Sequence, residues 1–148
     1  MSDKFDIVCA AYLLLLSDGR ILLSKRLNTG YQDGKYSLVA GHVEFGETPT
    51  QCIIREAAEE AGILLKEKDL SVVHTMWRDY RTTTDSNRLD IFFIATNWDG
   101  NVVNNEPGKC SDLSWFDPDH FPKNTAVYVS QAFKLIEAGI FYSEYKAD

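Results

Sequence analysis

Three glutamates, Glu56, Glu59 and Glu60, have the spacing in this sequence that most clearly suggests chemistry. Residues three and four apart are neighbours on a helix, so these carboxylates would share one face. Carboxylates at that spacing repel one another, more strongly where water is partly excluded. Because Mg²⁺ and Mn²⁺ prefer carboxylate and water oxygens, a bound divalent cation would offset the repulsion. A solvated acidic helix face is the alternative interpretation.

A helix must hold those glutamates, and the surrounding sequence contains signals for both of its ends. Thr48 precedes Pro49 and, further on, Gln51, which is the pattern of a threonine N-cap, a proline in the first turn and a capping box. Gly62 then provides the stop. We predict a helix between these signals, with one side buried in the core. The residues expected on the buried side are Ile53, Ile54, Ala57, Ala58 and Ala61.

The composition is that of one globular domain with a sizeable core. The chain has 148 residues, of which 45% are hydrophobic and 12% aromatic, so we expect a single domain over residues 1–148. The formal net charge of −7 disfavours a nucleic-acid polymer as a partner, because gripping its backbone needs a broad positive surface. A small phosphorylated substrate remains compatible, since a metal ion and a few local basic groups can hold it.

Cysteine usage and hydropathy indicate the compartment. Cys9, Cys52 and Cys110 are far apart and form no Cys-x-x-Cys pair, so neither a zinc site nor a disulfide framework is indicated. We interpret Cys52 as a small packing residue. The longest apolar run, Ile7–Leu16, is too short to span a bilayer. We expect a cytoplasmic protein with no membrane partner.

The segments before the glutamates read as strands and a loop. Phe5–Ser17 and Arg20–Ser24 are rich in β-branched and large apolar residues, and the Asp18-Gly19 turn between them predicts a hairpin. Asn28–Gly34 is a polar, glycine-punctuated loop. Tyr36–Ala40 is short enough to be a strand that delivers the chain to the motif helix.

The segments after the glutamates complete a mixed fold. We predict a second hairpin from Leu70–Tyr80 and Arg88–Asn97, joined by the polar connector Arg81–Asn87, and a short strand at Leu113–Phe116. Apolar residues at helical spacing predict a helix over Thr125–Ala138. Strands therefore outnumber helices, which predicts an α/β or α+β fold in layers.

The stretch GHVEFGETPTQCIIREAAEEAGI, residues 41–63, resembles the motif of the Nudix hydrolases. The runs RLNTGYQDGKYSLVAGHVEFGE and NNEPGKCSDLSWFDPDHFP also look like the MutT-like branch of that family. The resemblance implies a mixed sheet between helices, with the motif as a loop-helix-loop, and cleavage of a nucleoside diphosphate linked to another group, X, at its pyrophosphate. The residues at the motif's fixed positions are Gly41, Glu47, Arg55, Glu56, Glu59, Glu60 and Gly62.

The resemblance also implies roles for these residues. It makes Glu56, Glu59 and Glu60 candidate Mg²⁺ ligands, with Mn²⁺ as an alternative ion and the backbone near Gly41 beside the metal. Arg55 is implied as an orienting partner for Glu47 or Glu56. Metal-bound water must attack phosphorus, and a carboxylate within reach can take its proton. Glu59 is our first candidate for a ligand with a part in base catalysis, and Glu106 is the candidate from outside the motif.

Residues that select the substrate lie outside the motif. Lys25 or Arg26 could bind substrate phosphate, although surface solvation also explains two adjacent basic residues. His42 could meet a phosphate or form a local hydrogen bond, and Lys109 is a further phosphate candidate. A nucleobase could stack on an aromatic side chain, although most aromatic side chains belong to the core. The aromatic candidates are Tyr31, Trp77, Tyr80 and Trp115.

The resemblance favours a Mg²⁺-dependent pyrophosphohydrolase that cuts a nucleoside triphosphate, canonical or oxidised, to the monophosphate and pyrophosphate. An ADP-sugar or dinucleotide pyrophosphatase is the first alternative. A catalytically silent nucleotide-binding module is the second, although such modules typically lack motif carboxylates that this sequence retains. Removal of messenger-RNA caps is disfavoured by the acidic charge. The sequence leaves a homodimer open.

Overall fold

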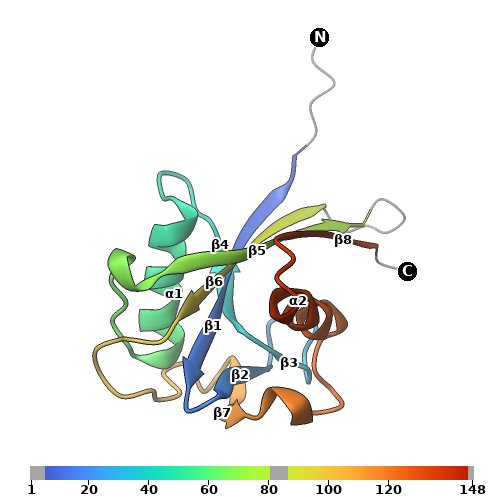
Figure 1. Cartoon of the computed structure of the whole chain (residues 1–148). Helices are drawn as coiled ribbons and strands as arrows, with labels where there is room; N and C mark the ends of the chain where they lie inside the picture. The colour runs from blue at the N-terminus through green and yellow to red at the C-terminus, as the bar shows by residue number, and fades with distance from the viewer. Residues whose placement is uncertain (1–5, 81–86, 147–148) are drawn as a thin grey trace.

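A mixed sheet with one helix on each face forms the body of the molecule (Figure 1). The computed structural model describes residues 6–80 and 87–146. Within these ranges the sheet order is β3-β2-β1-β6-β5-β8, with β4 paired to β1 and β7 paired to β2. The elements are β1 Val8–Ser17, β2 Arg20–Arg26, β3 Tyr36–Ser37, β4 Val39–His42, α1 Pro49–Ala61, β5 Ser71–Asp79, β6 Arg88–Ala95, β7 Cys110–Phe116, α2 Val127–Glu137 and β8 Tyr142–Lys146.

Strand β1 runs through the centre of the sheet and is buried on both faces. It pairs in parallel with β6 and antiparallel with β4. Leu13 and Leu15 belong to the core cluster under α1, whereas Tyr12 and Leu14 belong to the cluster under α2. Because side chains alternate along a strand, β1 supplies both cores. This explains its nearly continuous apolar sequence.

Helix α1 begins and ends where the sequence predicts. Thr48 Oγ1 accepts a hydrogen bond from Gln51 N, and Thr48 N donates to the side-chain oxygen of Gln51, which closes the capping box. Gly62 ends the helix in the left-handed conformation, with φ 68°. Cys52 is buried, as its interpretation as a packing residue requires. Ala58, predicted to be buried, is instead exposed, and Ile54 is only partly buried, because the sheet covers a narrower stripe of the helix.

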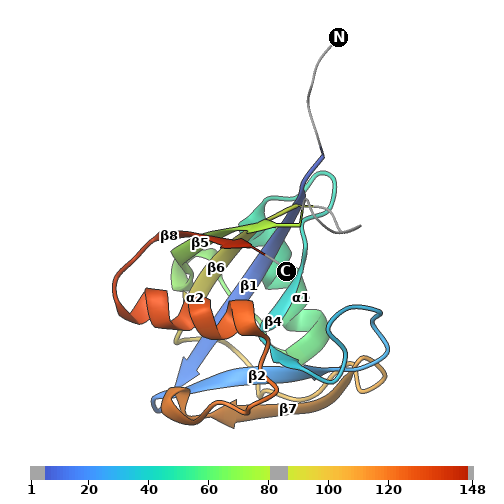
Figure 2. The same cartoon turned by 90° about the vertical axis from the view of Figure 1, so that its right-hand side faces the viewer.

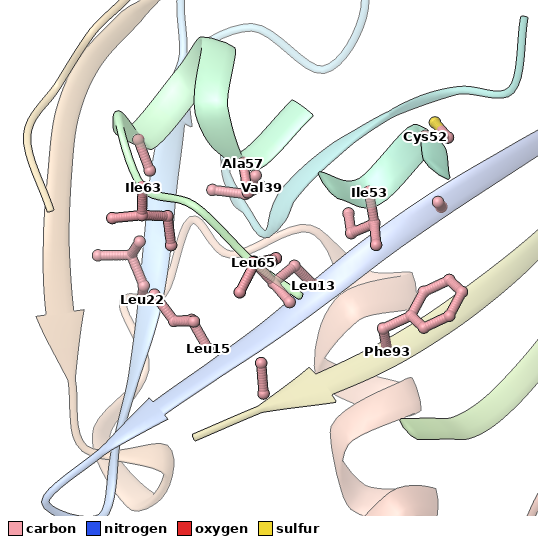
Figure 3. Packing of buried hydrophobic residues seen from close by; sticks show 13 residues of the cluster. Leu13, Leu15, Leu22, Val39, Cys52, Ile53, Ala57, Ile63, Leu65 and Phe93 are labelled. Atoms are coloured by element: carbon pink, nitrogen blue, oxygen red, sulfur yellow. The ribbon is translucent and has the colours of Figure 1, made fainter. Parts of the chain in front are cut away.

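The apolar side of α1 packs onto β1 and β6 (Figure 3). Cys52, Ile53 and Ala57 meet a layer that includes Leu13 and Phe93, and each of these five side chains is at most 3% exposed. Burial of one such large side chain is worth about 1.5–3 kcal/mol. The packing fixes the rotation of α1, so Glu56 and Glu60 on its acidic face lie beside β4.

The sheet differs from the prediction in three places. The predicted strand Tyr36–Ala40 divides into β3 and β4, because the chain changes partner from β2 to β1. Strand β7 begins at Cys110, earlier than the predicted Leu113, because pairing with β2 continues to Arg26. Strand β8, which pairs with β5, was not predicted.

Other predicted elements are confirmed. The two hairpins form as antiparallel pairs, β1 with β2 and β5 with β6. Helix α2 occupies most of the predicted range Thr125–Ala138. Phe5 and most of the connector Arg81–Asn87 lie outside the described residues. Among the helices that the structure describes, none is both long and apolar enough to cross a membrane.

Candidate active site

The acidic face of α1 forms one wall of an open cavity of about 470 Å³. Strands β2 and β4 supply a second wall, and the loop before β7 supplies the third. In Figure 2 the blue loop that leaves β2 lies beside the gold loop that leads into β7, and Leu27 N donates to Lys109 O at 2.9 Å between them. The lining residues are Ser24, Arg26, Asn28, Thr29, Leu38, Ala40, Gly41, Glu44, Arg55, Glu56, Glu59, Glu60, Glu106 and Lys109.

Arg55 joins the carboxylates of the cavity. Its Nη2 lies 2.7 Å from Glu47 Oε1, and its Nη1 lies 2.6 Å from Glu56 Oε1 and 3.3 Å from Glu59 Oε2. It also donates to the backbone oxygen of His42 at 3.2 Å. The hydrogen bonds from Arg55 lower the pKa of Glu47 to about 2. Arg55 therefore bridges the motif loop to α1.

Strand β4 passes close to the glutamates. A Cβ atom at Gly41 would overlap the carboxylate of Glu56, so this position requires glycine. One residue upstream, the backbone nitrogen of Ala40 donates to Glu60 Oε2 at 3.2 Å. The close approach places a backbone edge directly against two of the three predicted metal ligands.

The glutamates differ in their surroundings. The Glu59 side chain is 49% exposed and the Glu56 side chain 14% exposed. Burial raises the pKa of Glu60 well above its usual range, and the neighbouring Glu56 raises it further. Burial also raises the pKa of Glu56, although the hydrogen bond from Arg55 opposes this. Glu56 and Glu60 are therefore neighbouring carboxylates, largely shielded from water, with too little positive charge nearby to balance both of them.

This set of donors fits a divalent cation by its chemistry. The donors are carboxylate oxygens, which hard cations prefer, and a cation would relieve the charge on Glu56 and Glu60. In the described ranges, no three His, Cys, Asp or Glu side chains already stand in a metal-binding arrangement. Arg55 accounts for this, because its guanidinium supplies counter-charge to Glu56 and Glu59.

The loop before β7 closes the cavity opposite the motif loop. Asn105 N donates to Glu60 O at 3.1 Å, and its side-chain nitrogen donates to Glu59 O at 3.2 Å. These bonds hold the loop at the C-terminal end of α1. Glu106 and Lys109 therefore line the same cavity as the motif glutamates.

A second cavity, of about 200 Å³, adjoins the first and shares Arg26, Thr29, Ala40 and Gly41 with it. It lies on the α2 side of β4. Two of its basic side chains meet directly, because Arg88 Nη1 lies 3.0 Å from His42 Nε2. The remaining lining residues are Ala10, Tyr12, Tyr31 and Tyr128.

His42 and Tyr31 have local partners in this second cavity. Burial lowers the pKa of His42 and the Arg88 charge lowers it further, so a neutral ring can accept from Arg88. The guanidinium groups of Arg26 and Arg88 lie 5.6 and 4.6 Å from the centre of the Tyr31 ring. Tyr31 therefore already stacks with cations of the protein.

Four of the predicted substrate residues line neither cavity. The Lys25 ammonium lies over the Tyr36 ring at 5.9 Å, and Trp115 stacks on Trp98 with ring centres 6.0 Å apart. Tyr80 is only 6% exposed. Trp77 lies on β5 in register with Leu89. The roles predicted for these four residues stay predictions, and among the aromatic candidates Tyr31 is the one that lines a described cavity.

Arg88, Tyr12 and Tyr128 line the second cavity but were not predicted. Arg88 begins a strand, and the two tyrosines sit among core residues, so local sequence carries no functional pattern for them. The pairing of β1 with β6 brings Arg88 and Tyr12 onto neighbouring strands, and the packing of α2 on the sheet adds Tyr128. The sequence did contain one signal for Tyr12. This polar aromatic residue interrupts the aliphatic run of β1, which could have marked it as a candidate.

Comparison with known proteins identifies a family and several relatives. A family model described as the NUDIX domain matches residues 6–136. The NAD-capped RNA hydrolase NudC of Chromobacterium violaceum is 33% identical over 87% of this chain and 45% of that protein. The ADP-ribose pyrophosphatase of Methanocaldococcus jannaschii is 32% identical over 74% of this chain and 62% of that protein. This chain thus spans about half to two thirds of their lengths.

A shorter relative and several solved structures match over more of their length. The 8-oxo-dGTP diphosphatase of Escherichia coli is 26% identical over 80% of this chain and 89% of that protein. The crystal structure of a MutT NUDIX hydrolase from Burkholderia pseudomallei superposes with a TM-score of 0.79 at 23% identity, covering 88% of this chain and 98% of that chain. The structural likeness confirms the predicted fold class.

Proposed function

The chain belongs to the Nudix hydrolase family, and from this premise we propose that it hydrolyses the pyrophosphate bond of a nucleoside diphosphate linked to X. The favoured substrate is a nucleoside triphosphate, canonical or oxidised, cut to the monophosphate and pyrophosphate. One observation carries this choice: the α1 carboxylates, Glu106, Arg26 and Lys109 face a single cavity. Acidic groups suited to a cation and basic groups suited to phosphate thus surround the same space.

Different residues have different roles in the proposed reaction. Glu56 and Glu60, beside the Gly41 backbone, would hold Mg²⁺ or Mn²⁺, with Glu59 as the third ligand. The cation supplies charge neutralisation and a more acidic bound water. Arg55 fixes Glu47 and Glu56 in place. Glu59, the most exposed of the three, accepts the proton of the attacking water, and Glu106 is the alternative base across the cavity.

The two adjoining cavities suggest how the substrate lies. Phosphates occupy the larger cavity, where Arg26 and Lys109 offset their charge. The nucleoside enters the smaller cavity, between the aromatic walls of Tyr12 and Tyr128 and the Arg88 guanidinium. Arg26 lines both cavities, so it lies at the boundary between the phosphates and the nucleoside.

The named relatives define the competing substrates. Among them, an ADP-ribose pyrophosphatase supports the alternative of an ADP-sugar or dinucleotide substrate. Several NudC relatives are named for NAD-capped RNA, so our expectation that no nucleic-acid polymer is bound stays a prediction. A single domain over residues 1–148, a cytoplasmic location and a homodimer are likewise proposals.

A substrate panel tests the proposed function. Purified protein is assayed with canonical and oxidised nucleoside triphosphates, ADP-ribose, dinucleotides and NAD-capped RNA, and hits are repeated in heavy-oxygen-labelled water to identify the attacked phosphorus. We expect pyrophosphate release from a triphosphate, loss of activity with chelator and recovery with Mg²⁺ or Mn²⁺. A metal-independent rate, or cleavage confined to another member of the panel, would contradict the proposal.

The variant Glu59→Gln sharpens this test. A general base contributes about 10²–10⁴-fold, so turnover should fall by at least two orders of magnitude while the thermal midpoint stays near that of the parent. Glu67→Gln, in an exposed turn after α1, is the matched control and should retain full turnover. Normal turnover in folded Glu59→Gln would remove Glu59 from the mechanism.

A further inference from the structure

Arg78 and Asp90 form a fully buried ion pair, each with 0% exposure. Arg78 Nε lies 2.5 Å from Asp90 Oδ2, and Arg78 Nη2 donates to Asp90 Oδ1 at 3.3 Å. Neither residue lines either of the two cavities described above. The proposed reaction therefore gives this pair no direct role.

The remaining donors of Arg78 all point to tyrosines. Nη1 donates to the hydroxyls of Tyr31 at 2.7 Å and Tyr80 at 3.0 Å, and Nη2 donates to the hydroxyl of Tyr12 at 2.9 Å. The guanidinium also lies 3.8 Å from the centre of the Tyr128 ring. Both Nη atoms of the guanidinium thus have hydrogen-bond partners, Nε faces Asp90 Oδ2 in the ion pair, and these contacts favour one orientation of the group.

Stability alone does not explain this arrangement. Taking two charges out of water costs several kcal/mol per ion, and apolar replacements of similar volume are often neutral or stabilising. A buried guanidinium with fixed donors does, however, set the positions of the groups that accept from it. The tyrosines that surround Arg78 are therefore where its effect should be found.

Three of these tyrosines, Tyr12, Tyr31 and Tyr128, line the second cavity. Tyr12 and Tyr128 come from β1 and α2, which are fixed by the core. Tyr31 comes from the loop between β2 and β3, and its hydroxyl is the contact of that loop with Arg78. Arg78 thus connects the interior of the sheet to a surface loop.

The same loop holds Arg26. The backbone oxygen of Tyr31 accepts from Arg26 Nε at 2.6 Å, and Thr29 Oγ1 accepts from Arg26 Nη2 at 3.0 Å. Within the loop, the Asp33 carboxylate accepts hydrogen bonds from the backbone nitrogens of Thr29 and Gly30. Displacement of Tyr31 would therefore move the acceptors that orient the Arg26 guanidinium.

We propose that Arg78 is a positioning residue for substrate binding, which acts through Tyr31 to hold the Arg26 guanidinium at the boundary of the two cavities. The proposal rests on the proposed function for the part played by Arg26. One part of the proposal is structural: the Tyr31 hydroxyl attaches the loop to Arg78. This part does not depend on which substrate is cleaved.

The first test measures the loop without any substrate. Tyr31→Phe removes only the hydroxyl, and hydrogen exchange of the backbone amides in residues 28–35 should accelerate about tenfold or more, because a hydrogen bond to a charged group is lost. Tyr145→Phe is the matched control, since Tyr145 packs edge-on against Tyr128 away from the loop. It should leave exchange in the loop unchanged. Equal exchange in Tyr31→Phe and the parent would overturn the attachment.

The second test is a double-mutant cycle on the nucleotide that the parent protein cleaves best. Tyr31→Phe should raise KM about tenfold with kcat within about twofold, and should add little to the KM of Arg26→Ala, because both changes remove the same interaction. Arg78→Lys should resemble Tyr31→Phe. Multiplicative effects on KM would show that Tyr31 does not act through Arg26 and would overturn the proposal.

The two measurements separate the two proposals. Faster loop exchange in a protein that cleaves no nucleotide would contradict the proposed function and the substrate role of Arg78, while the loop attachment would stand. Active protein with unchanged loop exchange and unchanged KM in Tyr31→Phe would contradict the positioning role alone.

Discussion

Gly41 sets how closely two walls of the larger cavity, β4 and the acidic face of α1, approach each other. It has no side chain, and the Glu56 carboxylate lies where a Cβ atom would be. Any other residue would move either β4 or Glu56. The glycine thus determines the distance between a strand backbone and the acidic face of α1.

Gly41→Ala should therefore reduce turnover strongly. A displacement of about 1 Å at a catalytic group can cost about 100-fold in rate, and we expect a loss of that order with the fold retained. Gly108→Ala is the control, because a Cβ atom there meets nothing within 4 Å and its φ is not positive. Steady-state kinetics and thermal unfolding of both variants check the prediction, which unchanged turnover in Gly41→Ala would refute.

Individual residues were predictable where a local pattern encodes them. The carboxylates of α1 and their Arg55 partner follow from spacing along one helix, and Arg55 indeed contacts both Glu47 and Glu56. Arg78 was not predicted, because its partners come from distant segments. Its position on the buried face of β5, between neighbours of alternating burial, was the only local indication.

At the scale of elements, α1 is specified by its own ends. The capping box of Thr48 and Gln51 closes one end, and Gly62 closes the other by donating to Ala57 O and Ala58 O. Neither signal depends on tertiary contacts, which is why the helix could be located from the sequence. The packing of Ile53 and Ala57 then sets its rotation.

Thr48→Ala should lower the free energy of unfolding by about 1 kcal/mol, the usual cost of losing an N-cap side chain. Urea unfolding followed by circular dichroism measures this directly. Thr50→Ala is the matched control inside the first turn, and it should not destabilise, because alanine has the higher helix propensity. Equal stability of Thr48→Ala and the parent would show that the capping box contributes nothing.

Some strands could not be located from the sequence, because pairing with a distant strand determines whether the segment becomes a strand. The sequence of β8, Tyr142–Lys146, shows no regular alternation of apolar and polar residues, and its exposed positions 142, 144 and 146 include a tyrosine. It becomes a strand because β5 offers an unpaired edge. The division of residues 36–42 into β3 and β4 is likewise decided by two different partner strands.

At the scale of the whole molecule, the C-terminal segment is joined to β5, near the edge of the sheet, by strand pairing and by one buried histidine. His74, 1% exposed, contacts Ile140 O at 2.8 Å through Nδ1 and Ser143 Oγ at 2.7 Å through Nε2. Both ring nitrogens are thus satisfied from a segment that lies far along the chain.

Ser143→Ala should destabilise the fold by about 1–3 kcal/mol, because it leaves a buried ring nitrogen without its partner. Chemical denaturation gives the difference. Ser71→Ala, at an exposed position of β5, is the control and should stay within about 0.5 kcal/mol of the parent. A stability of Ser143→Ala equal to that of the control would mean that water replaces the lost hydroxyl.

The alternation of β4 has a consequence for how this protein can change over evolutionary time. Gly41 faces α1 and His42 faces the second cavity, so inserting or deleting one residue in Val39–His42 would exchange the two and abolish both compartments. The loop between β2 and β3 ends before this strand, so its length is restricted by the contacts of Tyr31 and not by the alternation of β4. Residues 39–42 should therefore keep an invariant length among descendants, whereas length changes in residues 28–35 should occur only where the contact of Tyr31 with Arg78 is kept.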